Sequence, residues 1–138
     1  MHTLQAYPLF TVKHLKESRD FFQRCFNMLV VFEASWVVML SNQDGGPISL
    51  GLMSHDHPSN PPGPETFDGR GMIMTFQVDD ASTAHARLKE LGAPIVYDVK
   101  DEPWGQRRFM VRDPSSILVD VVEQREPAPG YWEKFMGS

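Results

Sequence analysis

Residues 12–27 read VKHLKESRDFFQRCFN and residues 78–92 read VDDASTAHARLKELG, and the two stretches follow one plan. Each starts with a valine, continues with a polar helix start and an amphipathic run, and ends at Asn27 or Gly92. Asparagine and glycine readily take the left-handed conformation that ends a helix. Because the two valines are 66 positions apart, the chain is predicted to repeat one structural unit.

Three apolar, strand-like runs follow each predicted helix, and one precedes it. They cover 4–12, 29–33, 36–41 and 48–53 in the first copy, and 72–78, 95–99, 107–112 and 117–123 in the second. We therefore predict an α+β fold of two tandem βαβββ modules, 4–53 and 72–123, which form a curved mixed sheet around a cleft. The cleft is the expected functional site.

The remaining segments differ in composition from the modules. Residues 54–71 are rich in proline and lack an apolar period, so they are predicted as a long exposed linker. The tail, 124–138, holds Tyr131, Trp132 and Phe135. Three solvated aromatic rings would leave much apolar area in water, so a short docked helix is predicted there. We treat 1–138 as one domain.

Size and charge exclude several classes of partner. A chain of 138 residues can bury a substantial core. A net charge of −5 argues against nucleic acid, which needs clustered lysine and arginine. No apolar run approaches about 18 residues, and no secretory signal is visible, so no membrane partner is expected. Cys25 is the only cysteine and is predicted as a buried hydrophobe, which fits a reduced, cytoplasmic location.

Several segments resemble the vicinal oxygen chelate superfamily of glyoxalases, bleomycin-resistance proteins and extradiol dioxygenases. They are FTV at 10–12, QVDD at 77–80, DEPWGQR at 101–107, DP at 113–114 and LVDVVE at 118–123. The EPWG segment is most similar to the bleomycin-resistance branch. The resemblance implies paired βαβββ modules and, commonly, a homodimer. It leaves the substrate open, because this fold carries lyases, dioxygenases, epimerases and drug-binding proteins.

The resemblance also implies where a metal ion would be held. The family's metalloenzymes take ligands from the first and fourth strands of each module. The matching positions here are Tyr7, the neighbourhood of Gly51, Ile73 or Met72, and Asp120. Of these side chains only Asp120 is a good ligand, and one carboxylate does not hold a catalytic metal. We therefore expect no metal and no other cofactor.

A cleft without metal ligands would be apolar and aromatic, which suits a planar organic ligand held by stacking. Seven residues are expected to contact such a ligand: Tyr7, Trp36, Leu50, Ile73, Trp104, Asp120 and Glu102. Trp104 either stacks on a cationic heteroaromatic ligand or packs between the modules. Asp120 either contacts the ligand or lies at a dimer seam. Glu33 is a further candidate for the lining.

The leading expectation is a metal-independent small-molecule binding protein similar to the drug-sequestering bleomycin-resistance proteins. Its ligand would be organic, with a cationic aromatic compound as one candidate, and its partner a second copy of the chain. The competing class is a metal-dependent glyoxalase-like lyase or dioxygenase with displaced ligands such as His55 and His57. A third class binds an ordinary metabolite. Arg107 and Asp113 are predicted to form a structural pair.

Overall fold

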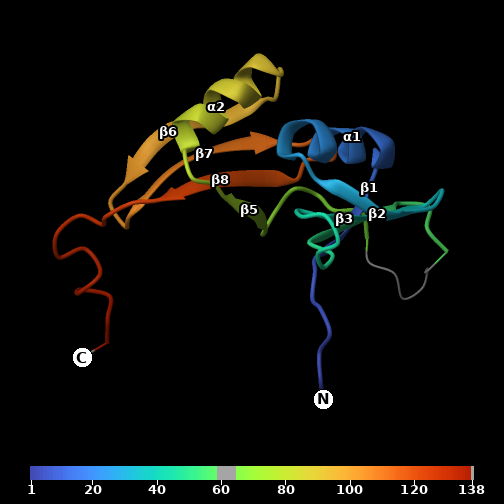
Figure 1. Ribbon diagram of the computed structural model, residues 1–138, viewed down its shortest axis with the longest axis horizontal. Coiled ribbons are helices and arrows are strands. Elements are labelled where there is room, and N and C mark those ends of the chain that lie inside the picture. The colour runs from blue at the N-terminus through green and yellow to red at the C-terminus, as the bar shows by residue number, and fades with distance from the viewer. Residues whose placement is uncertain (59–64, 138) are drawn as a thin grey trace. The chain divides into compact units, whose positions relative to one another are not determined.

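A computed structural model of the chain describes residues 1–58 and 65–137. It divides into two compact units (Figure 1). Unit 1 contains residues 1–70 together with the loop 113–116, and unit 2 contains 71–112 and 117–138. Both units have the same element order, a strand, a helix and then three strands, so the predicted βαβββ repeat is confirmed.

Unit 1 is a four-stranded mixed sheet with one helix on it. Its elements are β1 (Leu9–Val12), α1 (Leu15–Phe26), β2 (Leu29–Glu33), β3 (Val37–Ser41) and β4 (Leu50–Ser54). The strand order is β1-β4-β3-β2, and β1 is parallel to β4. Phe21, Phe22 and Cys25 of α1 are buried, as are Leu40 and Leu50 of the sheet. The predicted burial of Cys25 is confirmed.

Unit 2 repeats this arrangement. Its elements are β5 (Ile73–Gln77), α2 (Ala81–Glu90), β6 (Ile95–Glu102), β7 (Gln106–Arg112) and β8 (Leu118–Gln124). The order is β5-β8-β7-β6, with β5 parallel to β8. Figure 1 shows α2 over one face of this sheet. Phe109, Val111, Val119 and Val121, which alternate along β7 and β8, form the core of the unit and are buried.

Both helices end at the residues that the sequence indicates. Asn27 has a φ of 54°, and Gly92, just after α2, has a φ of 81°. The carboxylate of Asp80 accepts a hydrogen bond of 3.0 Å from the backbone N–H of Thr83, which caps α2. No helix in the described part of the chain is long and apolar enough to cross a membrane.

The loop 113–116 is fastened to α1 by a buried polar cluster. Ser18 Oγ donates to Asp113 Oδ2 at 2.6 Å and also lies 2.6 Å from Ser115 Oγ. Asp113 Oδ1 accepts from the backbone N–H of Ser115 at 2.9 Å. The predicted pair of Arg107 with Asp113 is therefore wrong. Arg107 instead forms a two-point contact with the carboxylate of Asp101, at 2.6 and 3.1 Å.

The predicted linker, 54–71, is less exposed than expected where it is described. Residues 59–64 of it lie outside the described residues. His57 is buried. Phe67 donates its backbone N–H to the carbonyl of Thr11 at 2.8 Å, and its ring meets Phe10 edge-on with centroids 5.1 Å apart. Part of this segment thus extends the core of unit 1 beyond β1.

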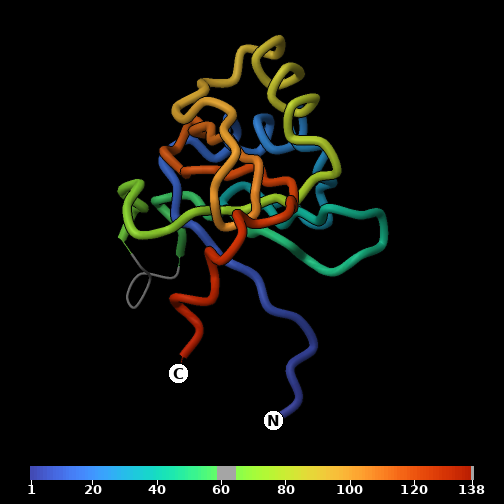
Figure 2. Tube along the Cα trace, turned by 90° about the vertical axis from the view of Figure 1, so that its left-hand side faces the viewer, coloured from blue at the N-terminus to red at the C-terminus, as the bar shows by residue number. Residues whose placement is uncertain are grey.

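The C-terminal segment, residues 125–137, contains turns and no regular helix (red in Figure 2), so the predicted helix is wrong. Pro127 and Pro129 supply no backbone N–H, and Gly130 has a φ of 76°, which leaves the helical region. Tyr131, Trp132 and Phe135 pack against one another instead, with ring centroids 5.3 to 6.5 Å apart.

Candidate functional site

Asp120 lies in the middle of β8, on the face of the unit 2 sheet opposite α2. In the sheet register Asp120 is paired with Thr75 of β5 and with Met110 of β7. Directly paired residues project to the same face, so these side chains share one surface with Ile73 and Arg108. We call this surface the open face, because Ile73 and Thr75 are exposed on it and α2, the helix of unit 2, lies on the other face.

Arg108 is the centre of a cluster on the open face. We define the Arg108 cluster as Arg108, Tyr97, Glu102, Trp104 and Asp120. The guanidinium lies over two aromatic rings, 5.2 Å from the Tyr97 centroid and 5.0 Å from the Trp104 centroid. Its Nε donates to Glu102 Oε2 at 2.7 Å, and Nη1 is 3.8 Å from Asp120 Oδ1. Strands β6, β7 and β8 thus place two carboxylates and two rings around one cation.

Glu102 is the firmly held carboxylate of this cluster. Its side chain is 3% exposed and accepts hydrogen bonds from Arg108 and from the hydroxyl of Tyr97, the latter at 2.8 Å. Burial raises the pKa of Glu102, but the two hydrogen bonds together with the charges of Arg108 and Lys100 outweigh burial, and the pKa is lowered. Glu102 is therefore a charged structural partner of Arg108: Oε2 accepts both hydrogen bonds, and Oε1 lies 3.8 Å from Nζ of Lys100.

Asp120 is the loosely held carboxylate. It is 6% exposed, and Oδ2 accepts a long hydrogen bond of 3.4 Å from Thr75. Among the described residues, Oδ1 has no hydrogen-bond donor. Burial raises the pKa of Asp120, and the charge of Arg108 opposes this shift without cancelling it. A buried acceptor without a donor is costly, so Asp120 Oδ1 is the unsatisfied polar atom of this cluster.

Trp104 joins the cluster from the turn between β6 and β7. Its indole Nε1 donates to Gln106 Oε1 at 2.9 Å. Its ring faces the guanidinium of Arg108, so the cation on Trp104 in this structure belongs to the protein itself. A ligand would contact Trp104 on the part of this half-buried ring that Arg108 does not cover.

The predicted site residues of unit 1 do not form a comparable cluster. Tyr7 precedes β1 and is 37% exposed, and Trp36 in the β2–β3 hairpin is exposed to the same extent. Leu50 is completely buried and paired with Leu40 in the core of unit 1, so it presents no surface to a ligand in this structure. Ile73 lies on the open face of unit 2 and is exposed.

The positions implied for metal ligands do not suit a metal ion. A side chain at Gly51 would meet Leu9 Cδ1 at 2.8 Å and Met39 Sδ at 3.1 Å, so apolar atoms fill that place on β4. Ile73 has no donor atom, and Asp120 is a single carboxylate. No group of three or more histidine, cysteine, aspartate or glutamate side chains is arranged for a metal within residues 1–58 and 65–137.

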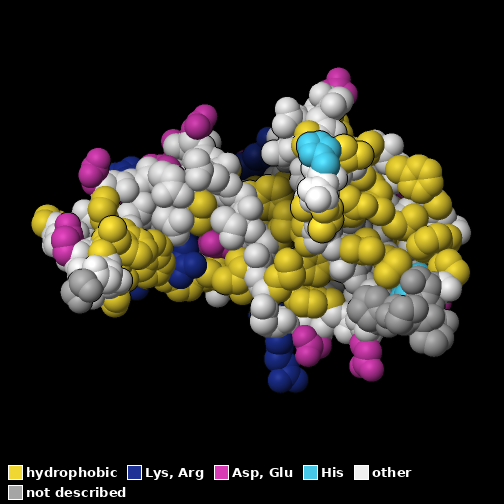
Figure 3. Space-filling view, turned by 90° about the horizontal axis from the view of Figure 1, so that it is seen from below, with side chains coloured by type: hydrophobic (Ala, Val, Ile, Leu, Met, Phe, Trp, Pro, Cys, Tyr) yellow, Lys and Arg dark blue, Asp and Glu magenta, His cyan; other side chains and the backbone are white. Residues whose placement is uncertain are grey.

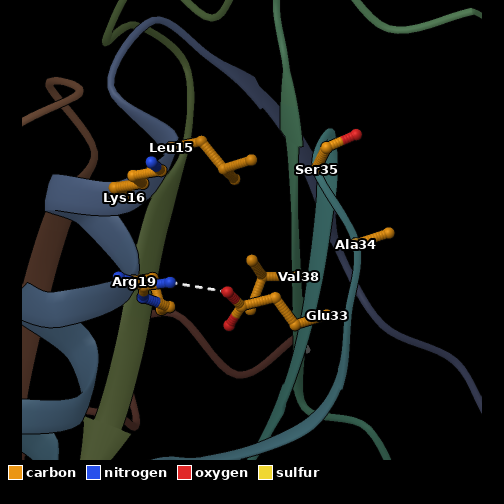
Figure 4. Close-up of a pocket in the computed structure, with 7 residues that line it drawn as sticks. All are labelled: Leu15, Lys16, Arg19, Glu33, Ala34, Ser35 and Val38. Carbon is orange, nitrogen blue, oxygen red and sulfur yellow. Dashed lines mark hydrogen bonds and ion pairs between the residues drawn. The ribbon is translucent and has the colours of Figure 1, made fainter.

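Two cavities in unit 1 are lined by none of the seven predicted residues. One, of about 220 Å³, lies between α1 and the β2–β3 hairpin. In Figure 4, Leu15 and Val38 point into it, and Arg19 faces Glu33 across it at 2.6 Å. Glu33, a further candidate for the ligand lining, is thus engaged in an ion pair. The other cavity, of about 440 Å³, is bordered by the loop 113–116 and Phe67.

The sequence interpretation missed Tyr97 and Arg108. Alternation along 106–112 puts Arg108 and Met110 on one strand face, and that signal was available. Whether Arg108 and Met110 share a face with Asp120 depends on the register between β7 and β8, in which Met110 pairs with Asp120. That register is a property of the folded sheet.

Comparisons with known proteins agree with this architecture. The family model described as Glyoxalase/Bleomycin resistance protein/Dioxygenase superfamily matches residues 2–121. No curated protein matches the chain significantly. Many solved structures share the fold at low sequence identity.

Three of these structures illustrate the likeness. A glyoxalase/bleomycin resistance protein/dioxygenase from Nocardioides is 17% identical, with a TM-score of 0.73 over 94% of this chain and 89% of that one. TioX from Micromonospora sp. ML1 is 19% identical, with a TM-score of 0.70 over 88% and 99%. Lactoylglutathione lyase from Agrobacterium tumefaciens is 20% identical, with a TM-score of 0.68 over 88% and 94%. Identities this low establish the fold alone.

Proposed function

The chain belongs to the glyoxalase/bleomycin resistance protein/dioxygenase superfamily, and from this premise we propose that it binds a small organic ligand without a metal ion. The ligand would lie on the open face of unit 2, against the Arg108 cluster. Binding would act by sequestration, as in the drug-binding members of the family, so no catalytic residue is required.

The observation that carries this proposal is the buried oxygen of Asp120. Oδ1 has no hydrogen-bond donor among the described residues, whereas Oε2 of the neighbouring Glu102 accepts from both Arg108 and Tyr97. A ligand N–H or O–H group within reach of Oδ1 would remove the cost of this unpaired acceptor. Trp104 and Tyr97 supply flat apolar surface beside it, which favours a planar or aromatic ligand.

A cationic ligand is favoured over an anionic one. Arg108 is already balanced by Glu102, whereas Asp120 has no donor on Oδ1 and lies 3.8 Å from Nη1 of Arg108. A positive ligand group at Oδ1 would stabilise the charged carboxylate, and an anion there would be repelled. The net charge of −5 also attracts cations at long range.

We further expect the protein to act as a homodimer in the cytoplasm. The family likeness supports the dimer, and the single buried Cys25 is compatible with a reduced compartment.

Bleomycin, a bulky cation with planar rings, is a suitable first probe. We expect it to quench tryptophan fluorescence of the wild-type protein saturably. Asp120→Asn should raise the Kd at least tenfold, about 1.4 kcal/mol. Arg107→Gln is the matched control, because Arg107 neighbours Arg108 on the same strand but contacts exposed Asp101. Equal weakening by both variants, or no quenching by bleomycin or by ethidium, contradicts the proposal.

Metal analysis separates this function from its main competitor. Protein purified without chelator should contain far less than one equivalent of zinc, nickel, manganese or iron per chain. Near one equivalent, lost on Asp120→Asn, would instead support a metal-dependent lyase or dioxygenase whose other ligands come from elsewhere in the assembly.

A further inference from the structure

The C-terminal segment returns to the turn that carries Trp104. Arg125 donates its backbone N–H to the carbonyl of Gly105 at 2.8 Å, and Ala128 donates to the carbonyl of Pro103 at 2.9 Å. The indole Nε1 of Trp132 then donates to the carbonyl of Trp104 at 2.8 Å. Three consecutive residues of the turn, 103–105, are therefore each bound to the segment that follows β8.

Gly105 shows how closely the two segments approach. It has a φ of 109°, and a side chain there would lie 2.8 Å from the carbonyl oxygen of Arg125 and 3.2 Å from the nitrogen of Pro127. Backbone thus lies directly against backbone, which requires glycine at this position.

The end of the segment is a small aromatic cluster with much exposed surface. Trp132 is 45% exposed and Phe135 62%, and the ammonium of Lys134 lies over the rings of Tyr131 and Phe135 at 5.2 and 5.5 Å. Figure 3 shows hydrophobic side chains gathered around the C-terminal segment, at the left of that view. Core burial therefore does not account for Trp132, whose specific contact is the hydrogen bond to Trp104.

We propose that the C-terminal segment is a working part of the ligand site, in which Trp132 is a positioning residue for Trp104. By holding the carbonyl of Trp104, the Trp132 indole fixes the turn whose side chain lies over Arg108. The ring of Trp104 is held at its other end by Gln106. Loss of the Trp132 hydrogen bond leaves the turn held only through Pro103 and Gly105, on either side of Trp104, and widens the range of positions of the Trp104 ring. This inference rests on the proposed ligand site.

The first test needs no ligand. In the ¹⁵N-labelled full chain each of the three tryptophans gives one indole N–H signal, which single Trp→Phe substitutions assign. Trp132→Phe keeps an aromatic ring in the cluster but removes the donor. We expect it to shift the Trp104 indole signal and to speed its exchange with water at least threefold. Phe135→Leu, which alters the same cluster without touching the turn, should leave the Trp104 signal in place.

The second test measures affinity for bleomycin by calorimetry. Trp132→Phe should weaken binding about three- to tenfold, and Phe135→Leu less than twofold. A Trp104 signal unmoved by Trp132→Phe, or moved equally by Phe135→Leu, overturns the positioning role. An altered Trp104 signal with unchanged affinity in a wild-type protein that binds overturns the link to the ligand. Absence of bleomycin and ethidium binding in the wild type counts against the proposed function, while the ligand-free spectra still decide the contact.

Discussion

Arg107 and Arg108 are neighbours in sequence, but Arg107 pairs with an exposed carboxylate and Arg108 with a buried one. Alternation on β7 sends Arg107 to exposed Asp101 and Arg108 to Glu102, whose side chain is 3% exposed. The shortest N–O distances are alike, at 2.6 and 2.7 Å, but Arg107 makes a two-point contact in solvent, whereas Arg108 makes a single hydrogen bond to a buried carboxylate. The Arg108 pair, unlike the Arg107 pair, leaves a costly buried charge if it is broken.

Arg108→Met should therefore lower the free energy of unfolding by about 3 kcal/mol, since it leaves buried Glu102 with only the exposed Lys100, 3.8 Å away, as a cation. Arg107→Met should lower it much less, because its pair with Asp101 is exposed. Urea denaturation measures both. Adding Glu102→Met to Arg108→Met should recover part of the loss, and a double variant that is less stable than the single one would contradict this account.

Asp120 predicts a pH dependence of stability. Burial raises the pKa of Asp120 above its unfolded value, so the folded state binds this proton more tightly. Its contribution to stability is then complete below the unfolded pKa, about 3.9, and is lost as pH rises through the folded pKa. Asparagine does not titrate, so it makes no pH-dependent contribution. The free energy of unfolding of Asp120→Asn relative to wild type should increase across this interval, and a difference independent of pH would contradict the raised pKa.

The sequence predicted some residues of the Arg108 cluster and not others. Asp120 was found because the family resemblance marks its position, and Glu102 and Trp104 because they lie in a recognisable segment. Arg108, which the structure places among all three, carries no motif of its own. Its position depends on the pairing of β7 with β8, which local sequence does not encode.

At the scale of elements, the helices were the most predictable part of the chain. Each combines an amphipathic period with a terminal signal, Asn27 for α1 and Asp80 with Gly92 for α2, and these signals act within a few residues. The C-terminal segment was mispredicted because its aromatic residues suggested docking by a helix. Pro127, Pro129 and the backbone contacts of Gly105 direct it into turns instead.

Gly105 and Gly92 allow a comparison of backbone strain with steric contact. Both have positive φ, but an added Cβ at Gly92 meets no atom within 4 Å, whereas at Gly105 it meets the Arg125 carbonyl at 2.8 Å. Gly92→Ala should cost about 1 kcal/mol of unfolding free energy. Gly105→Ala should cost roughly 1 to 3 kcal/mol more. Thermal denaturation of both variants tests this order, and equal losses would place the Arg125 contact in doubt.

At the scale of the whole molecule, the repeat is the feature that the sequence revealed best. The spacing of the two helices predicted two βαβββ units, and both sheets have the same strand order with the first and last strands parallel. The parallel pairing joins the ends of each unit.

We predict that the whole protein forms a homodimer. Light scattering coupled to size-exclusion chromatography should give a mass near twice the 15.7 kDa of one chain. Because a family-type dimer buries apolar surface, the mass should persist in high salt, which screens charged contacts. A mass of a single chain at micromolar concentration would contradict the proposed partner.

The fastening of residues 113–116 to α1 has a consequence for biosynthesis. Ser18 forms a hydrogen bond with Ser115, which lies 97 residues further along the chain. At about 5 to 20 residues per second, a ribosome needs roughly 5 to 20 s to make that stretch. During this interval the Ser18 hydroxyl on α1 lacks its partners in the folded protein, so these contacts of α1 form only after residues 113–116 have been made.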